Sequence, residues 1–228
     1  MRYLYFVIAL LMIAGCAVAD DIVTMPTANQ LKAGEVDVAV YYIKLDNPQP
    51  APQQVHYQTV YVGVTDRLEI DAHFAQVHRD RDSTVLVASY KALSETPKQP
   101  DVVIGCRNLT GSKTTNNPSV KNFGKDRSYF VAAAKTFFAD NSRPGPPLLR
   151  VHLGVGTADH TLMGEVRHRG LFGGLQFLLR PDIGMVAEHD GQDMITALTY
   201  MPKNTGLTIK GGGYGKHWWA GAALRKTF

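Results

Sequence analysis

Apolar and polar residues alternate along most of the chain that follows Gly34. From Arg67 to Phe74, apolar side chains at even positions alternate with charged or imidazole side chains at odd positions, and the pattern recurs from Leu149 to Val155. Successive side chains of a β-strand point to opposite faces of the sheet, so each of these segments has one apolar face and one polar face. The pattern therefore predicts an all-β protein.

Turn residues, mainly glycine, proline, asparagine and aspartate, divide this pattern into a series of strands. We expect strands at residues 36–46, 55–64, 67–77, 84–92, 101–110, 127–138, 148–156, 170–180, 183–190, 193–201, 206–214 and 216–228. Many are about ten residues long, which suffices to cross a bilayer at a tilt, whereas strands of soluble proteins are more often shorter. Residues 34–228 are therefore expected to form a closed, antiparallel, up-and-down transmembrane β-barrel of about twelve strands. A soluble barrel or sandwich with an apolar core also fits the alternation.

The polar faces of the predicted strands carry charges of both signs, as expected where side chains meet across a narrow lumen. These residues are Glu69, Asp71, His73, Lys135, Arg150, His152, Glu188 and Lys210, and all of them except Lys135 are expected to line the lumen. Trp218 and Trp219, near the end of the chain, are expected to belong to an aromatic girdle at the membrane interface.

The first twenty residues have the features of an export signal. Arg2 precedes an apolar stretch at residues 3–14 that is too short to span a membrane. The small residues that follow fit two processing routes. Ordinary signal cleavage would remove residues 1–19, whereas the lipobox-like sequence ending at Cys16 would make that cysteine an acylated lipid anchor. Residues 20–33 would then form a plain linker, a periplasmic arm or a plug inside the lumen.

Composition and motifs argue against several other functions. The net charge is only +4, and no basic run is longer than two residues, so no nucleic-acid partner is expected. Once Cys16 is removed or acylated, Cys106 is the remaining thiol, and its apolar neighbours indicate a strand residue. The glycine-rich segment 211–216 departs from the phosphate-loop pattern, and the histidines and carboxylates lack metal-ligand spacing, so neither a metal nor a cofactor is expected.

A hydrolase site is the main enzymatic alternative. Ser89 and His73 fall on neighbouring predicted strands with Asp71 nearby, and this combination of residue types can form a nucleophilic triad. Because no signature of an outer-membrane lipid hydrolase is legible, we expect no enzymatic activity. A lipid-modifying hydrolase and a soluble periplasmic barrel that binds an apolar ligand are the alternatives.

Several short segments resemble a known family. They are Thr24–Ala28 with Leu31 and Gly34, Gly63–Ile70, Leu171–Phe177 and Val186–Gly191. In these segments the chain resembles the YjbH-type exopolysaccharide-associated outer-membrane β-barrel lipoproteins, as a small single-barrel relative. The resemblance implies a location in the outer membrane of a diderm bacterium, a lipid at Cys16, and a part in the export or assembly of surface polysaccharide. It supplies no catalytic residues.

The C-terminal residue Phe228 is preceded by apolar residues at alternate positions, Ala220, Ala222 and Leu224. This ending resembles the assembly signal of outer-membrane barrels, although Lys226 stands where an apolar residue is usual. The expected partners are therefore outer-membrane lipid, the barrel assembly machinery and surface polysaccharide. The expected function is a non-enzymatic outer-membrane barrel that forms a narrow pore or assists polysaccharide export.

Overall fold

The structure is a computed structural model, and it describes much of the chain that follows the predicted leader. The described residues are 27–46, 54–77, 82–110, 127–137, 149–157, 159–160, 166–167 and 170–228. Among them, no helix is long and apolar enough to cross a bilayer.

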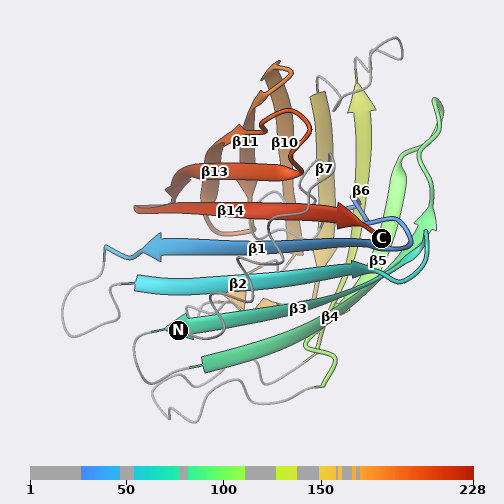
Figure 1. The fold of residues 1–228 in the computed structure, drawn as a ribbon. Helices are drawn as coiled ribbons and strands as arrows, with labels where there is room; N and C mark the ends of the chain where they lie inside the picture. The colour runs from blue at the N-terminus through green and yellow to red at the C-terminus, as the bar shows by residue number, and fades with distance from the viewer. Residues whose placement is uncertain are drawn as a thin grey trace.

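The described strands form a closed antiparallel barrel (Figure 1). Its strands are β1 (Glu35–Lys44), β2 (Gln54–Gly63), β3 (Leu68–Val77), β4 (Asp82–Leu93), β5 (Asp101–Arg107), β6 (Ser128–Phe137), β7 (Leu149–Gly156), β10 (Gly170–Arg180), β11 (Ile183–His189), β12 (Met194–Tyr200), β13 (Leu207–Tyr214) and β14 (His217–Thr227). Each strand pairs with its neighbours in the chain, counting β10 as the neighbour of β7, and β14 pairs with β1. The prediction of an all-β, twelve-stranded, closed up-and-down barrel is confirmed.

The strand bounds differ from the predicted ones most at β5 and in the segment before β10. Strand β5 ends at Arg107 rather than at residue 110, because Asn108 adopts a positive φ of 53° that leaves the extended conformation. A small two-stranded ribbon of β8 (Asp159–His160) and β9 (Val166–Arg167) lies within a segment predicted to be a loop. The pattern of alternation is too short in these two strands to be recognised.

The first strand, β1, begins at the same end of the barrel at which the last strand, β14, ends, and we call this end the terminal mouth (Figure 1). The turns at 64–67, 94–100, 181–182 and 201–206 lie at the same end because the strands alternate in direction. The opposite end, which we call the far mouth, carries the turns at 190–193 and 215–216.

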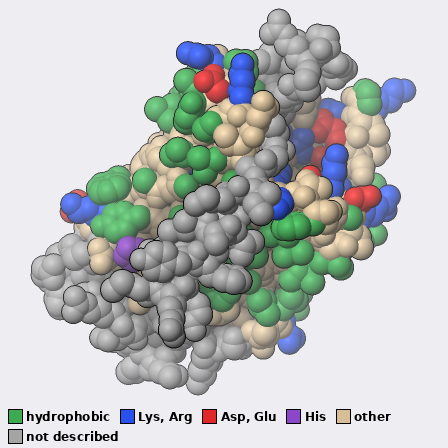
Figure 2. All heavy atoms as spheres, in the orientation of Figure 1, with side chains coloured by type: hydrophobic (Ala, Val, Ile, Leu, Met, Phe, Trp, Pro, Cys, Tyr) green, Lys and Arg blue, Asp and Glu red, His purple; other side chains and the backbone are tan. Residues whose placement is uncertain are grey.

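The outward face of the barrel is apolar. Large side chains on it are strongly exposed, such as Leu153 at 65%, Leu198 at 58% and Ile70 at 41%. Figure 2 shows hydrophobic side chains spread over the face in view, with charged side chains mostly towards its margins. On strands such as β3, β7 and β13, the structure therefore places the more apolar face on the outside, where a water-soluble barrel would have polar residues.

The pairing of the first strand, β1, with the last strand, β14, closes the barrel wall. Asp37 lies directly opposite Arg225 in this register, and the Arg225 Nε atom lies 3.2 Å from the Asp37 Oδ2 atom. Both side chains point inward and are largely buried, with 4% of the Asp37 side chain exposed. At the terminal mouth, the Phe228 amide donates a hydrogen bond to the Gly34 carbonyl oxygen, 3.0 Å away. The first and last strands are therefore held together by backbone pairing and by one interior ion pair.

Candidate functional site in the barrel lumen

The residues predicted to line the lumen all lie on inward rows of their strands. They are Glu69, Asp71, His73, Arg150, His152, Glu188 and Lys210. All except Arg150 are at most 5% exposed, and the side chain of Arg150 is 12% exposed. The residues next to them in the sequence, such as Ile70 and Leu153, face outward. The interior is therefore polar and charged on several walls of the barrel.

Lys135 and Trp219 lie on the face of the barrel wall opposite to the predicted one. Lys135 pairs with Val151 on an outward row, and its Nζ atom reaches the carbonyl oxygens of the 94–100 turn. Trp218 is 49% exposed, as a girdle residue would be, but Trp219 is 2% exposed. The expectation that both tryptophans belong to an outer girdle is wrong, because adjacent residues of a strand point to opposite faces.

The Trp219 side chain belongs to a continuous group of aromatic rings inside the lumen. Its ring centroid lies 6.0 Å from that of Tyr41, which lies 6.0 Å from that of Tyr57. The group continues through His73, whose centroid lies 5.7 Å from that of Tyr57 and 5.5 Å from that of Tyr61. These rings come from four adjacent strands, β14, β1, β2 and β3. One wall of the lumen thus carries a continuous group of rings, which we call the aromatic wall.

Glycines opposite interior aromatic residues make room for their rings. A β-carbon built on Gly221 would lie 2.1 Å from the Tyr41 ring, and Gly154 and Phe172 show the same relation at 2.1 Å. In both cases the glycine and the aromatic residue are direct cross-strand partners. The rings therefore lie close against the backbone of the neighbouring strand.

At the terminal mouth, the segment that precedes β1 enters the lumen. Leu31 is 1% exposed and Ala28 is 0% exposed, although neither belongs to a strand. The Leu31 amide donates to Glu69 Oε2 at 2.7 Å, and the Gln30 side-chain amide donates to Ser89 Oγ at 2.6 Å. Because Glu69 and Ser89 are opposed on the inward rows of β3 and β4, their partners lie inside the barrel.

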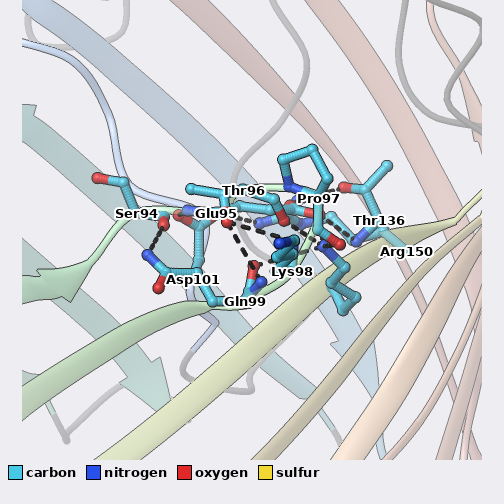
Figure 3. Close-up of polar contacts among 10 residues, drawn as sticks. Ser94, Glu95, Thr96, Pro97, Lys98, Gln99, Asp101, Thr136 and Arg150 are labelled. Carbon is cyan, nitrogen blue, oxygen red and sulfur yellow. Dashed lines mark hydrogen bonds and ion pairs between the residues drawn. The ribbon is translucent and has the colours of Figure 1, made fainter.

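The 94–100 turn is fixed at the rim of the terminal mouth by a cluster of charged residues (Figure 3). Arg150 places one guanidinium nitrogen 2.8 Å from Glu95 Oε2 and the other 2.6 Å from Asp101 Oδ2. The Glu95 carboxylate also accepts hydrogen bonds from the backbone amide and hydroxyl of Thr136 at 2.8 and 3.0 Å. Lys135 adds a further cation 3.3 Å from Glu95. This cluster joins the turn to β6 and β7.

The environment of Glu95 lowers its pKa from the usual value of 4.5. Burial raises the pKa, but the hydrogen bonds from Thr136 and the nearby Arg150 guanidinium together lower it by more. A carboxylate with a lowered pKa in the folded state stabilises that state at pH values above 4.5, and this stabilisation is lost as the pH falls through the lowered value.

We therefore expect a Glu95→Gln variant to unfold at a lower temperature than the native protein at neutral pH. The difference should shrink as the pH falls from 4.5 through the lowered pKa of Glu95, because the native carboxylate then becomes protonated too. The measurement is the temperature at which the folded band disappears on an unboiled detergent gel, taken across a pH series. Lys98→Gln, which changes an exposed charge in the same turn, is the control. A difference that does not change with pH would contradict this role for Glu95.

The residues of the candidate hydrolase triad are not assembled in the structure. Ser89 is paired with Glu69, whereas His73 is paired with Val85. Since Ser89 and Val85 are four residues apart on β4, Ser89 lies about 13 Å along the strand from the level of His73. The His73 Nδ1 atom instead contacts the Tyr57 hydroxyl. This arrangement places no imidazole beside the Ser89 hydroxyl, whose neighbour is the Glu69 carboxylate, 3.5 Å away.

Other predicted features lie outside the described residues or at their edge. The predicted signal peptide of residues 1–19, Cys16 and the first part of the 20–33 segment are outside them. Phe228 follows β14 and is 74% exposed. Cys106 lies on the outward row of β5. Within the described ranges, no group of three or more His, Cys, Asp or Glu residues could hold a metal ion.

Sequence reasoning missed three features of the lumen. The Asp37–Arg225 pair could have been found, since a closed barrel pairs its first and last strands and both residues lie on polar rows. The inward position of Trp219 follows from the same alternation. No sequence pattern predicted the Glu95 cluster, because the alternation that shows which way a strand residue faces does not extend into a turn.

Comparisons with known proteins support the fold. No protein-family model matches the sequence, and none of the curated proteins matches it. Among solved structures, the chain is similar to one described as KdgM porin, with a TM-score of 0.51 and 10% identity over 85% of this chain and 99% of that one. The N-terminal β-barrel domain of Pseudomonas aeruginosa OprF matches 86% of this chain and 100% of that chain at 9% identity, with a TM-score of only 0.27. The second likeness is too weak to bear on the fold.

The closed wall, the apolar exterior and the charged lumen together define an outward-apolar, closed antiparallel β-barrel. The likeness to the KdgM porin structure extends over most of both chains and concerns the fold alone.

Proposed function

We propose that this protein is a non-enzymatic barrel of the bacterial outer membrane that forms a narrow channel. The observation that carries the proposal is the outward exposure of large apolar side chains on a closed barrel whose interior holds buried charges. Lipid is the solvent that suits such an exterior, and a closed barrel leaves no unpaired strand edge in the hydrocarbon. A porin fold supports the channel function.

The proposal is tested by fractionating cells and by measuring conductance. The protein should sediment with outer membranes, migrate faster on detergent gels before boiling than after it, and give discrete current steps in planar bilayers. Recovery in the soluble periplasmic fraction with no shift on boiling would contradict the proposal and support a soluble barrel. Hydrolysis of phospholipid or lipid A that is lost in Ser89→Ala would support the hydrolase instead.

We further propose that saccharides are the solutes, in line with the resemblance to exopolysaccharide-associated barrels. The aromatic wall favours this class, because aromatic faces stack on the apolar faces of sugar rings while tyrosine hydroxyls can bind sugar hydroxyls. Trp219, Tyr41 and Tyr57 form its first part. A neutral gluco-oligosaccharide should block the channel current, and Trp219→Ala should weaken the block. A conducting channel that neither neutral nor acidic oligosaccharides block would contradict the choice of solute.

A further inference from the structure

We propose that residues Thr27–Ala33, which we call the latch segment, close the terminal mouth and that their release opens the channel. This inference rests on the proposed channel function. It concerns a segment that contacts inward residues of β3 and β4 and the neighbouring ends of β1 and β2.

The first observation is that the latch segment is buried without being part of the wall. Thr27, Ala28 and Leu31 are 6%, 0% and 1% exposed, whereas Lys32, Ala33 and Gly34 are exposed. The chain therefore passes from the solvent-exposed rim into the barrel between Lys32 and Leu31. Gly34, with a φ of 78°, reverses the chain direction between this segment and β1, which favours glycine at this position.

The second observation is a set of directed contacts between the latch segment and inward side chains. Glu69 accepts the Leu31 amide, and Ser89 accepts the Gln30 side-chain amide. The Ser89 hydroxyl is 3.5 Å from Glu69 Oε1, so the two acceptors are themselves linked. A hydrogen bond to a charged carboxylate is stronger than one between neutral groups. These contacts hold the segment inside the mouth, against the inward faces of β3 and β4.

The third observation is that the wall is shaped to receive the segment. A β-carbon built on Gly63, the last residue of β2, would lie 2.0 Å from the Lys32 carbonyl oxygen. No side chain larger than hydrogen fits there while Lys32 keeps its position. The Gly34 amide donates to the Gly63 carbonyl oxygen at 3.0 Å, and the Ala33 amide donates to Asp66 Oδ1 at 3.2 Å. The latch segment thus packs directly against the backbone of Gly63.

The latch segment is not part of the barrel wall, in which each strand is held to two neighbours along its length. The segment can therefore leave the lumen without disrupting the barrel, because no strand pairing depends on residues 27–33.

The position of the segment is tested by thiol bridging in the full-length protein. Gln30→Cys and Ser89→Cys are combined with Cys106→Ala, and dibromobimane, which becomes fluorescent when it bridges two nearby thiols, is added to the folded protein in membranes. We expect efficient bridging. The control pair is Gln30→Cys with Ser128→Cys, whose second residue faces inward at the far-mouth end of β6, and it should not bridge. A folded, heat-modifiable Gln30/Ser89 pair that does not bridge would overturn the inference.

The closure is tested by single-channel recording of Gly63→Ala and of a variant lacking residues 27–31. Both should conduct several-fold more current, on average over time, than the native protein, because the mouth is no longer covered. Gly213→Ala is the matched control, since its β-carbon would meet only the Thr196 hydroxyl oxygen, at an ordinary 3.5 Å.

The outcomes of the two tests separate the closure from the channel function. Native conductance in both latch variants, with thiol bridging intact, would show that the segment sits in the mouth without closing it. If every inserted variant, including the deletion, conducts no current, the channel function itself fails along with the closure.

Discussion

A lysine in place of Leu198 is expected to prevent most of the protein from folding into membranes. Leu198 is 58% exposed on the outward face of β12, and a lysine near the middle of the bilayer costs about 2–4 kcal/mol in a barrel of this type. That cost is a large part of the stability of a typical protein. The measurement is the folded fraction in lipid vesicles across a urea series, read from the gel shift on boiling.

Met194→Lys is the matched control on the same strand and face. Met194 is 52% exposed and begins β12 at the far mouth, where a lysine can reach water and the cost falls to about 0–1 kcal/mol. Equal effects of the two lysines would show that depth in a bilayer does not matter, and this would contradict the assignment of the outward face to lipid.

Arg225→Met is expected to destabilise the closure of the barrel by about 3–5 kcal/mol, because it leaves the Asp37 carboxylate buried without its cation. The Asp37 side chain is 4% exposed and lies opposite Arg225 in the pair of first and last strands. Urea unfolding in detergent, followed by the gel shift, measures the loss.

A double variant distinguishes the charge from the packing. Asp37→Leu combined with Arg225→Met removes both charges, and it should recover most of the lost stability, since replacing both members of a buried pair is commonly close to neutral. If the double variant is as unstable as Arg225→Met, the effect comes from lost packing of the arginine stem and the proposed role of the ion pair is wrong.

Much of the fold could be predicted from the sequence, because it depends on local alternation. Strand β3 shows this best: from Leu68 to Phe74 its apolar residues alternate with charged or imidazole residues, and each falls on the face that the alternation gives it. Long strands separated by turn residues were sufficient to predict a closed barrel. The end of β5 was missed because Asn108 leaves the strand through a positive φ, which asparagine tolerates but does not require.

The candidate site was less predictable, because it depends on contacts between residues far apart in the chain. The inward rows of Glu69 and His152 follow from alternation alone. The bond from Leu31 to Glu69 spans 38 positions, and the pair of Glu95 with Arg150 spans 55. Such contacts follow from the strand register and from the path of non-strand segments, and neither is encoded in a two-residue period.

The central claim is that the apolar face of the strands meets hydrocarbon while the charged face lines the lumen. The most direct measurement places a fluorescent label on single cysteines at successive positions from Glu69 to Phe74 of β3, in a Cys106→Ala background in lipid vesicles. Labels at Ile70, Ala72 and Phe74 should be quenched by a brominated lipid, and those at Glu69, Asp71 and His73 should not. Quenching in the opposite phase, or quenching that does not alternate, would contradict the account.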